Sequence, residues 1–62
     1  MFTIEIGFSD NETRKKVSKV YTDLATAESM AFYLLGGQTP RGVVSTAVVV
    51  GETGEIVAEF EY

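Results

Sequence analysis

The residues of this chain that could do chemistry are carboxylates, hydroxyls and a short run of cations, because the sequence holds neither His nor Cys. A serine nucleophile needs a base beside it, most often His, and metal sites with nitrogen or sulfur ligands need His or Cys. The serines of this chain lack that partner, and its lysines lie in a polar run rather than in an apolar pocket. We therefore expect no enzyme activity, no metal ion and no cofactor.

The carboxylates with the clearest spacing are at the end of the chain, where Glu55, Glu59 and Glu61 fall on one face of a predicted strand. Neighbouring positions on one face of a strand lie about 6.6 Å apart. Such a row, which Glu5 could join from an adjoining strand, can meet a basic protein surface or imitate the phosphates of a nucleic acid. It is also what an exposed strand needs to stay soluble and to avoid edge aggregation.

The cations are concentrated elsewhere, with Arg14, Lys15, Lys16 and Lys19 close to Tyr21. Residues 1–22 carry a net charge of +1 and residues 23–62 a net charge of −5, out of −4 for the whole chain. A basic run with an aromatic neighbour can follow a nucleic-acid backbone, so weak nucleic-acid binding is one alternative. The overall negative charge opposes it, and a solvated edge strand explains the same residues.

Two strands are predicted before the helix. Residues 2–8 alternate apolar and polar positions, which is typical of a half-buried strand. A polar cluster at 9–13 predicts a turn, and residues 14–22 then predict an edge strand that pairs back on the first.

A helix is predicted from Leu24 to Leu35, with Asp23 as N-cap and the glycine pair at 36 and 37 as its end. One broad apolar arc of this helix is expected to face the sheet; it holds Leu24, Ala27, Met30, Ala31, Leu34 and Leu35.

The helix also carries residues that fit its buried arc poorly. Glu28 falls within the arc, Phe32 lies at its rim and Tyr33 points away from it. These three predict either a mixed acidic and aromatic binding surface or ordinary packing in a dimer.

The last predicted element is a hairpin. The β-branched run from Val43 to Val50 is apolar on both faces, and Gly54 supplies the left-handed position of the turn. The helix can cover one face of this central strand, whereas the other face calls for a second molecule. The expected fold is a single α+β domain, residues 1–62, in which a small antiparallel sheet of order ββαββ carries one amphipathic helix on one face.

Size and hydropathy set further bounds. With 62 residues the chain buries only about 60% of the surface that it exposes when unfolded, which favours self-association, most simply a homodimer. Its apolar runs are far shorter than the roughly 20 residues that span a bilayer. We expect a cytoplasmic protein without a membrane partner.

Three segments mark the order of these elements. They are Val20-Tyr21-Thr22-Asp23-Leu24-Ala25-Thr26-Ala27-Glu28, which leads into the helix, Val43-Val44 in the second hairpin, and the terminal Phe60-Glu61-Tyr62. This layout resembles that of small bacteriophage-encoded α+β proteins that bind and inhibit host or defence enzymes. The resemblance covers the whole chain and implies protein binding in a host cytoplasm.

The leading functional prediction is a non-enzymatic protein-interaction module that binds a protein with a basic surface. The glutamates of the last strand would orient the partner, and aromatic side chains would anchor it. The predicted partner-binding residues are Glu55, Glu59, Glu61, Glu28, Phe32, Tyr33 and Tyr62. A structural homo-oligomer and a weak nucleic-acid binder through residues 14–19 are the alternatives.

Overall fold

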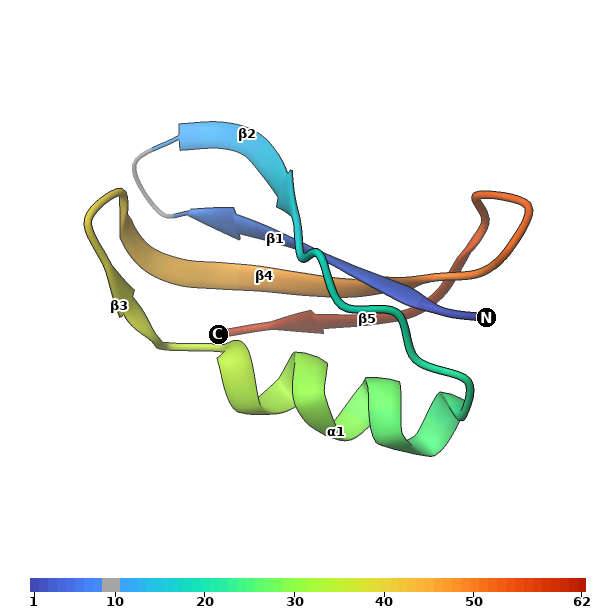
Figure 1. The fold of residues 1–62 in the computed structure, drawn as a ribbon. Coiled ribbons are helices and arrows are strands. Elements are labelled where there is room, and N and C mark those ends of the chain that lie inside the picture. Colours follow the sequence, from blue (N-terminus) through green and yellow to red (C-terminus); the bar gives the residue numbers. More distant parts are fainter. Residues whose placement is uncertain (9–10) are drawn as a thin grey trace.

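The computed structural model describes residues 1–8 and 11–62, with side chains described for all of these except 11–13. It has the predicted α+β fold, a curled antiparallel sheet with one helix across one face (Figure 1). The strands are β1 (Thr3–Phe8), β2 (Asn11–Lys16), β3 (Gln38–Thr39), β4 (Gly42–Val50) and β5 (Ile56–Glu61), and the helix is α1 (Leu24–Leu34).

Strand β4 lies at the centre of the sheet, as the two-sided apolar run predicts. It pairs with β1 along one side, and along its other side with β5 and the short β3. Strand β2 pairs with the outer side of β1. Within the described residues, β2 and β5 therefore form the two long edges of the sheet.

The second strand differs from its predicted range of residues 14–22. It spans Asn11–Lys16, so it begins inside the polar cluster from which a turn was expected; residues 9 and 10 of that cluster lie outside the described residues. After Val17, whose amide donates to the carbonyl of Ile4 at 2.8 Å, the chain leaves the sheet and returns only where Tyr21 pairs with Phe2. The alternation that a longer strand requires is broken by exposed polar residues in this segment.

Helix α1 begins where Asp23 caps it. The carboxylate accepts a hydrogen bond from the amide of Thr26 at 2.9 Å. At the other end Gly36 adopts φ +78°, a conformation that favours glycine. The amide of Gly36 donates to the carbonyl of Val44 at 2.8 Å, which ties the end of the helix to β4.

The helix rests on the sheet through small residues. Ala27 and Ala31 are fully buried, and the neighbouring Met30, Leu34 and Leu35 pack partly against the same core. Leu24 is an exception to the predicted buried arc, because it lies at the first turn and remains 37% exposed.

Strand β3 was not predicted, because two residues are too few to show a period. It forms in the loop between helix and β4, where Gln38 pairs with Val43 and Thr39 with Gly42. The hydroxyl of Thr39 also donates to the carbonyl of Gly42 at 2.7 Å. This tight hairpin places Arg41 at its tip.

The two faces of the sheet are covered differently. The face toward α1 holds the core, with Ile4, Ile6, Ala47 and Val49 all buried. On the opposite face, which we call the open face, Val48 is only 1% exposed although no element lies over it in the described structure.

Val48 lies between two glutamates in the sheet. Glu5 of β1 and Glu59 of β5 are its direct partners across the sheet. Side chains directly opposite each other on one face lie about 5 Å apart, and the methylene stems of glutamates can cover an apolar neighbour. A second molecule is therefore not needed to bury the centre of this strand.

Candidate functional site

Strand β5 brings two of the predicted glutamates onto one surface. Glu59 and Glu61 lie opposite Val48 and Thr46, so both belong to the open face, and both are exposed. The outer side of β5 pairs with no other strand in the described residues, which leaves a row of backbone amides and carbonyls available. We call Glu59, Glu61 and the outer side of β5 the acidic edge.

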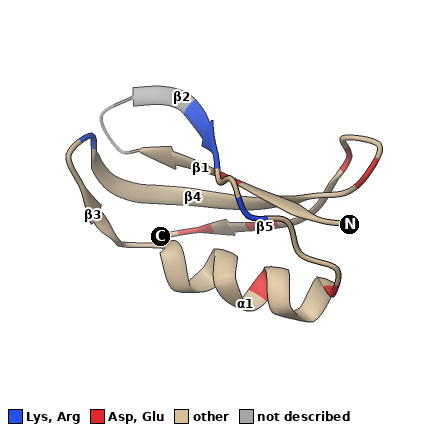
Figure 2. Cartoon of the chain, viewed as in Figure 1, with Lys and Arg blue, Asp and Glu red and all other residues tan. Residues whose placement is uncertain are grey.

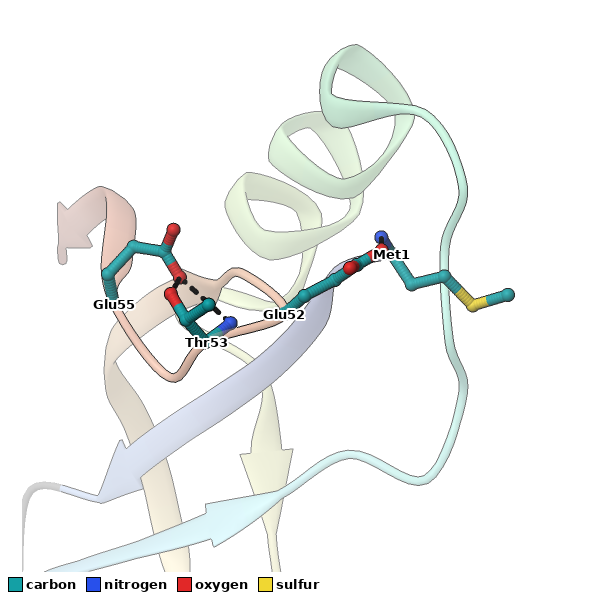
Figure 3. A network of polar contacts seen from close by, with 4 residues as sticks. All are labelled: Met1, Glu52, Thr53 and Glu55. Carbon is teal, nitrogen blue, oxygen red and sulfur yellow. Dashed lines mark hydrogen bonds and ion pairs between the residues drawn. The ribbon is translucent and has the colours of Figure 1, made fainter.

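Glu55 does not lie on that strand, which corrects the prediction of a three-residue row. It precedes β5 and belongs to the turn after β4. There the carboxylate of Glu55 accepts two hydrogen bonds from Thr53, one from the hydroxyl at 2.7 Å and one from the backbone amide at 3.2 Å (Figure 3). The pairing register also shifts between Val49 and Val50, so the period of β5 does not continue into the turn.

Hydrogen bonding in this turn tunes its carboxylates. The hydroxyl of Thr53 is the main cause of the lowered pKa of Glu55. The amino group of Met1 lies 2.6 Å from the carboxylate of Glu52, and this hydrogen bond, helped by the positive charge, lowers the pKa of Glu52 (Figure 3). Both glutamates are thus held as anions by partners inside the chain, and they serve the turn rather than the acidic edge.

Aromatic side chains lie beside the acidic edge, on the side of β5 that faces the helix. The rings of Phe32 and Phe60 meet edge to face, with centroids 6.1 Å apart and planes at 72°. Tyr62 packs against Gly36, one helical turn after Phe32. We call Phe32, Phe60 and Tyr62 the aromatic patch. Two of its side chains are largely exposed, Phe32 at 67% and Tyr62 at 82%.

The two remaining predicted residues have different positions. Tyr33 is 78% exposed on α1, next to Phe32 in the sequence. Glu28 is half-buried one turn before Phe32, consistent with its place within the predicted arc. Phe60 was expected only as one of the apolar residues of the last strand. Its alternation with Glu59 and Glu61 is the sequence signal that places its side chain on the opposite face from these glutamates, toward the helix.

Charges of opposite sign gather over different parts of the fold (Figure 2). Red segments mark the β4–β5 turn, β5 and α1, whereas blue segments mark β2, the chain after it and the tip of the β3–β4 turn. Lys15, Lys16 and Arg41 belong to this basic side and are exposed. Most of the acidic and basic residues are therefore separated in space, although Glu5 of β1 lies opposite Lys16 of β2.

Among the described residues, no group of three or more His, Cys, Asp or Glu is arranged to hold a metal ion. The described structure also has no helix with the length and apolar character required to cross a bilayer. Comparison with family models, curated proteins and solved structures gives no match. The function is therefore argued from the geometry of the chain itself.

Proposed function

We propose that this chain is a non-enzymatic protein-binding module that takes an extended segment of its partner onto the acidic edge. The observation that carries the proposal is the outer edge of β5, which has no partner strand in the described residues. The strand presents glutamates on one face and borders the aromatic patch on the other. Adding a strand to an exposed edge uses backbone hydrogen bonds for affinity and alternate side chains for specificity.

The two faces of β5 define the chemistry of the partner segment. A strand added to β5 would place every second side chain beside Glu59 and Glu61, where Lys or Arg is favoured. The intervening side chains would lie beside Phe32 and Phe60, where apolar groups are favoured because exposed aromatic residues often carry most of an interface's energy. The segment is therefore an alternation of basic and apolar residues.

An inhibitory role follows from this chemistry together with the resemblance to small bacteriophage proteins. An extended basic segment of a host or defence protein is the kind of surface that holds nucleic acid, and the acidic edge would occupy it in place of the phosphates. This inhibitor would act in the cytoplasm of the host cell.

The test uses two short peptides, one alternating Lys with Val and one alternating Glu with Val. Each is titrated into isotope-labelled protein while the backbone amides are followed by NMR. We expect the Lys peptide to shift the amides of β5 and to bind more weakly as salt is raised, because screening reduces attraction between exposed charges. Equal binding of the two peptides, or shifts that avoid β5, would contradict the proposal.

Variants separate charge from packing at the edge. The pair Glu59→Gln and Glu61→Gln should weaken the Lys peptide roughly fivefold, since each exposed pair contributes about 0.5 kcal/mol. The matched control, Ala25→Lys with Ser29→Lys, changes the net charge by the same amount on exposed positions of α1 and should change affinity little. Phe32→Ala should weaken binding about tenfold or more if the patch is the anchor.

A second candidate function is a homo-oligomer, which the opposite charges of the two sheet edges favour. Strand β2 carries Arg14 and Lys16, and β5 carries Glu59 and Glu61. If β2 of one copy paired with β5 of the next, the sheet would continue through a head-to-tail contact. Sedimentation of the protein from about 1 to 500 µM at low and high salt tests this, and a monomer throughout would remove the candidate while leaving peptide binding unaffected.

A further inference from the structure

A hollow of about 440 Å³ lies on the helix side of the sheet, between β2 and the β3–β4 turn. Its apolar lining includes Ile6 and Phe8 of β1, with Val17 and Pro40 at its sides. Helix α1 packs against β1, β4 and β5 but not against β2, so this half of the face has no helix over it in the described structure. The hollow is the part of the core that secondary structure leaves uncovered.

Three of the five basic residues of the protein are among those that line the hollow. Lys15 of β2 lies opposite Ile6, on the same face as the floor, whereas Lys16 lies opposite Glu5 on the open face. Arg41 comes from the tip of the β3–β4 turn, on the basic side seen in Figure 2. No Asp or Glu is among the described residues that line the hollow, and no ion pair to these three cations is found among the described side chains.

Arg41 shows how the floor is covered without a ligand. Its guanidinium carbon lies 5.5 Å from the centre of the Phe8 ring, so the cation itself shields the aromatic floor. Phe8 is only 5% exposed and belongs to the buried core. The long, solvent-exposed side chain of Arg41 can move off the floor more readily than a helix could. Its planar guanidinium can then bind a carboxylate through two hydrogen bonds.

We propose that this hollow binds a small organic carboxylate with an apolar chain of medium length. The apolar floor would take the chain, and Arg41 of the β3–β4 turn and Lys15 of β2 would take the carboxylate. The volume falls in the range of about 300–1,000 Å³ typical of small-molecule sites. Clustered like charges repel one another, and an anion between them relieves that repulsion.

The test compares three probes with alkyl chains of seven or eight carbons and different head groups: octanoate, octanol and octyltrimethylammonium. Each is titrated into the whole protein, and the amides of Ile6, Phe8 and Val17 are followed by NMR. We expect octanoate to shift these amides with an affinity at least fivefold higher than that of octanol, and octyltrimethylammonium to leave them unchanged. Equal affinities for octanoate and octanol would overturn the proposal, since the cations would then have no role.

Variants assign the carboxylate to its partners. Arg41→Gln and Lys15→Gln should each weaken octanoate about fivefold, the upper end of what one exposed ion pair contributes, while leaving octanol unchanged. Arg41→Lys should restore part of the loss because it keeps the charge. The matched control is Lys19→Gln: this cation lies 5.5 Å from the ring of Tyr21, outside the hollow, and its removal should not change octanoate binding.

Two further outcomes would also overturn the proposal. A loss of octanoate affinity in Lys19→Gln as large as in Arg41→Gln would show attraction by net charge alone. Shifts of Ile6 and Phe8 that follow protein concentration without any ligand would show that the hollow is filled by a second copy of the chain. Unchanged dispersion of the amide spectrum of each variant verifies that the fold is retained.

Discussion

At the scale of single residues, Asp23 shows how one carboxylate defines the start of the only helix in the described chain. Its pKa is lowered mainly by the hydrogen bond from the hydroxyl of Thr26 and further by the amide of the same residue. A carboxyl whose pKa is lower in the folded state stabilises the fold above its unfolded pKa, about 3.9, and this contribution is lost as the pH falls through the folded value.

The prediction at Asp23 uses Asp23→Asn, which retains an N-cap but does not titrate. Wild type should lose more stability than this variant between pH 5 and pH 2, because only wild type loses the charged cap. Urea unfolding at several pH values measures the free energy of unfolding of both proteins. Taking the difference between them removes the effect of the other carboxyls, which the two proteins share. Parallel pH profiles would contradict the assigned cause.

Gly36 is a second residue whose identity has a specific structural reason. Its φ is +78°, and a Cβ at this position would lie 2.5 Å from Cε1 of Tyr62. We expect Gly36→Ala to cost about 1–2 kcal/mol for the backbone conformation, with an additional loss from the clash with the ring. Gly54→Ala is the matched control, because Gly54 has φ +89° and nothing within 4 Å of its Cβ position.

Chemical denaturation of the two glycine variants separates the cost of the backbone conformation from the cost of the clash with Tyr62. If Gly36→Ala and Gly54→Ala lose the same stability, the contact with Tyr62 has no energetic importance. Adding Tyr62→Ala to Gly36→Ala should bring its loss close to that of Gly54→Ala, as expected for residues in contact.

At the scale of elements, the helix approaches the sheet closely because its contact residues are small. Ala27 and Ala31 are both fully buried against the core. We expect Ala31→Leu to destabilise the protein by about 1–3 kcal/mol, since a larger side chain there would push α1 away from β4. Ala25→Leu, at an exposed position of the same helix, should change the denaturation midpoint little; a similar loss in both variants would contradict this packing.

At the scale of the whole molecule, the acidic edge and the hollow lie on separate parts of the fold. The molecule measures 29 by 19 by 18 Å, whereas interactions between exposed charges are screened over about 8 Å at physiological ionic strength. We therefore expect saturating octanoate to change the affinity of the Lys peptide by less than twofold. A competition titration measures this, and mutual exclusion would show that both ligands use one site.

The sequence alone determined the features that depend on near neighbours. Alternation of apolar residues over 2–8 predicted β1, and Asp23, the apolar arc and Gly36 predicted the helix nearly to its ends. These signals suffice because strand pleat, helical period and capping involve residues within a few positions of one another. Alternation of the same period in the last strand placed Glu59 and Glu61 together on one face.

Only the tertiary structure decided the features that depend on distant segments. Glu55 leaves the acidic row because the β4–β5 register shifts and Thr53 holds its carboxylate. Val48, which lies between glutamates of β1 and β5, is buried within the chain itself. The hollow joins β1, β2 and the β3–β4 turn, which are separated along the chain. No local pattern encodes such a site, since it exists only where the sheet curls and the helix stops short of β2 (Figure 1).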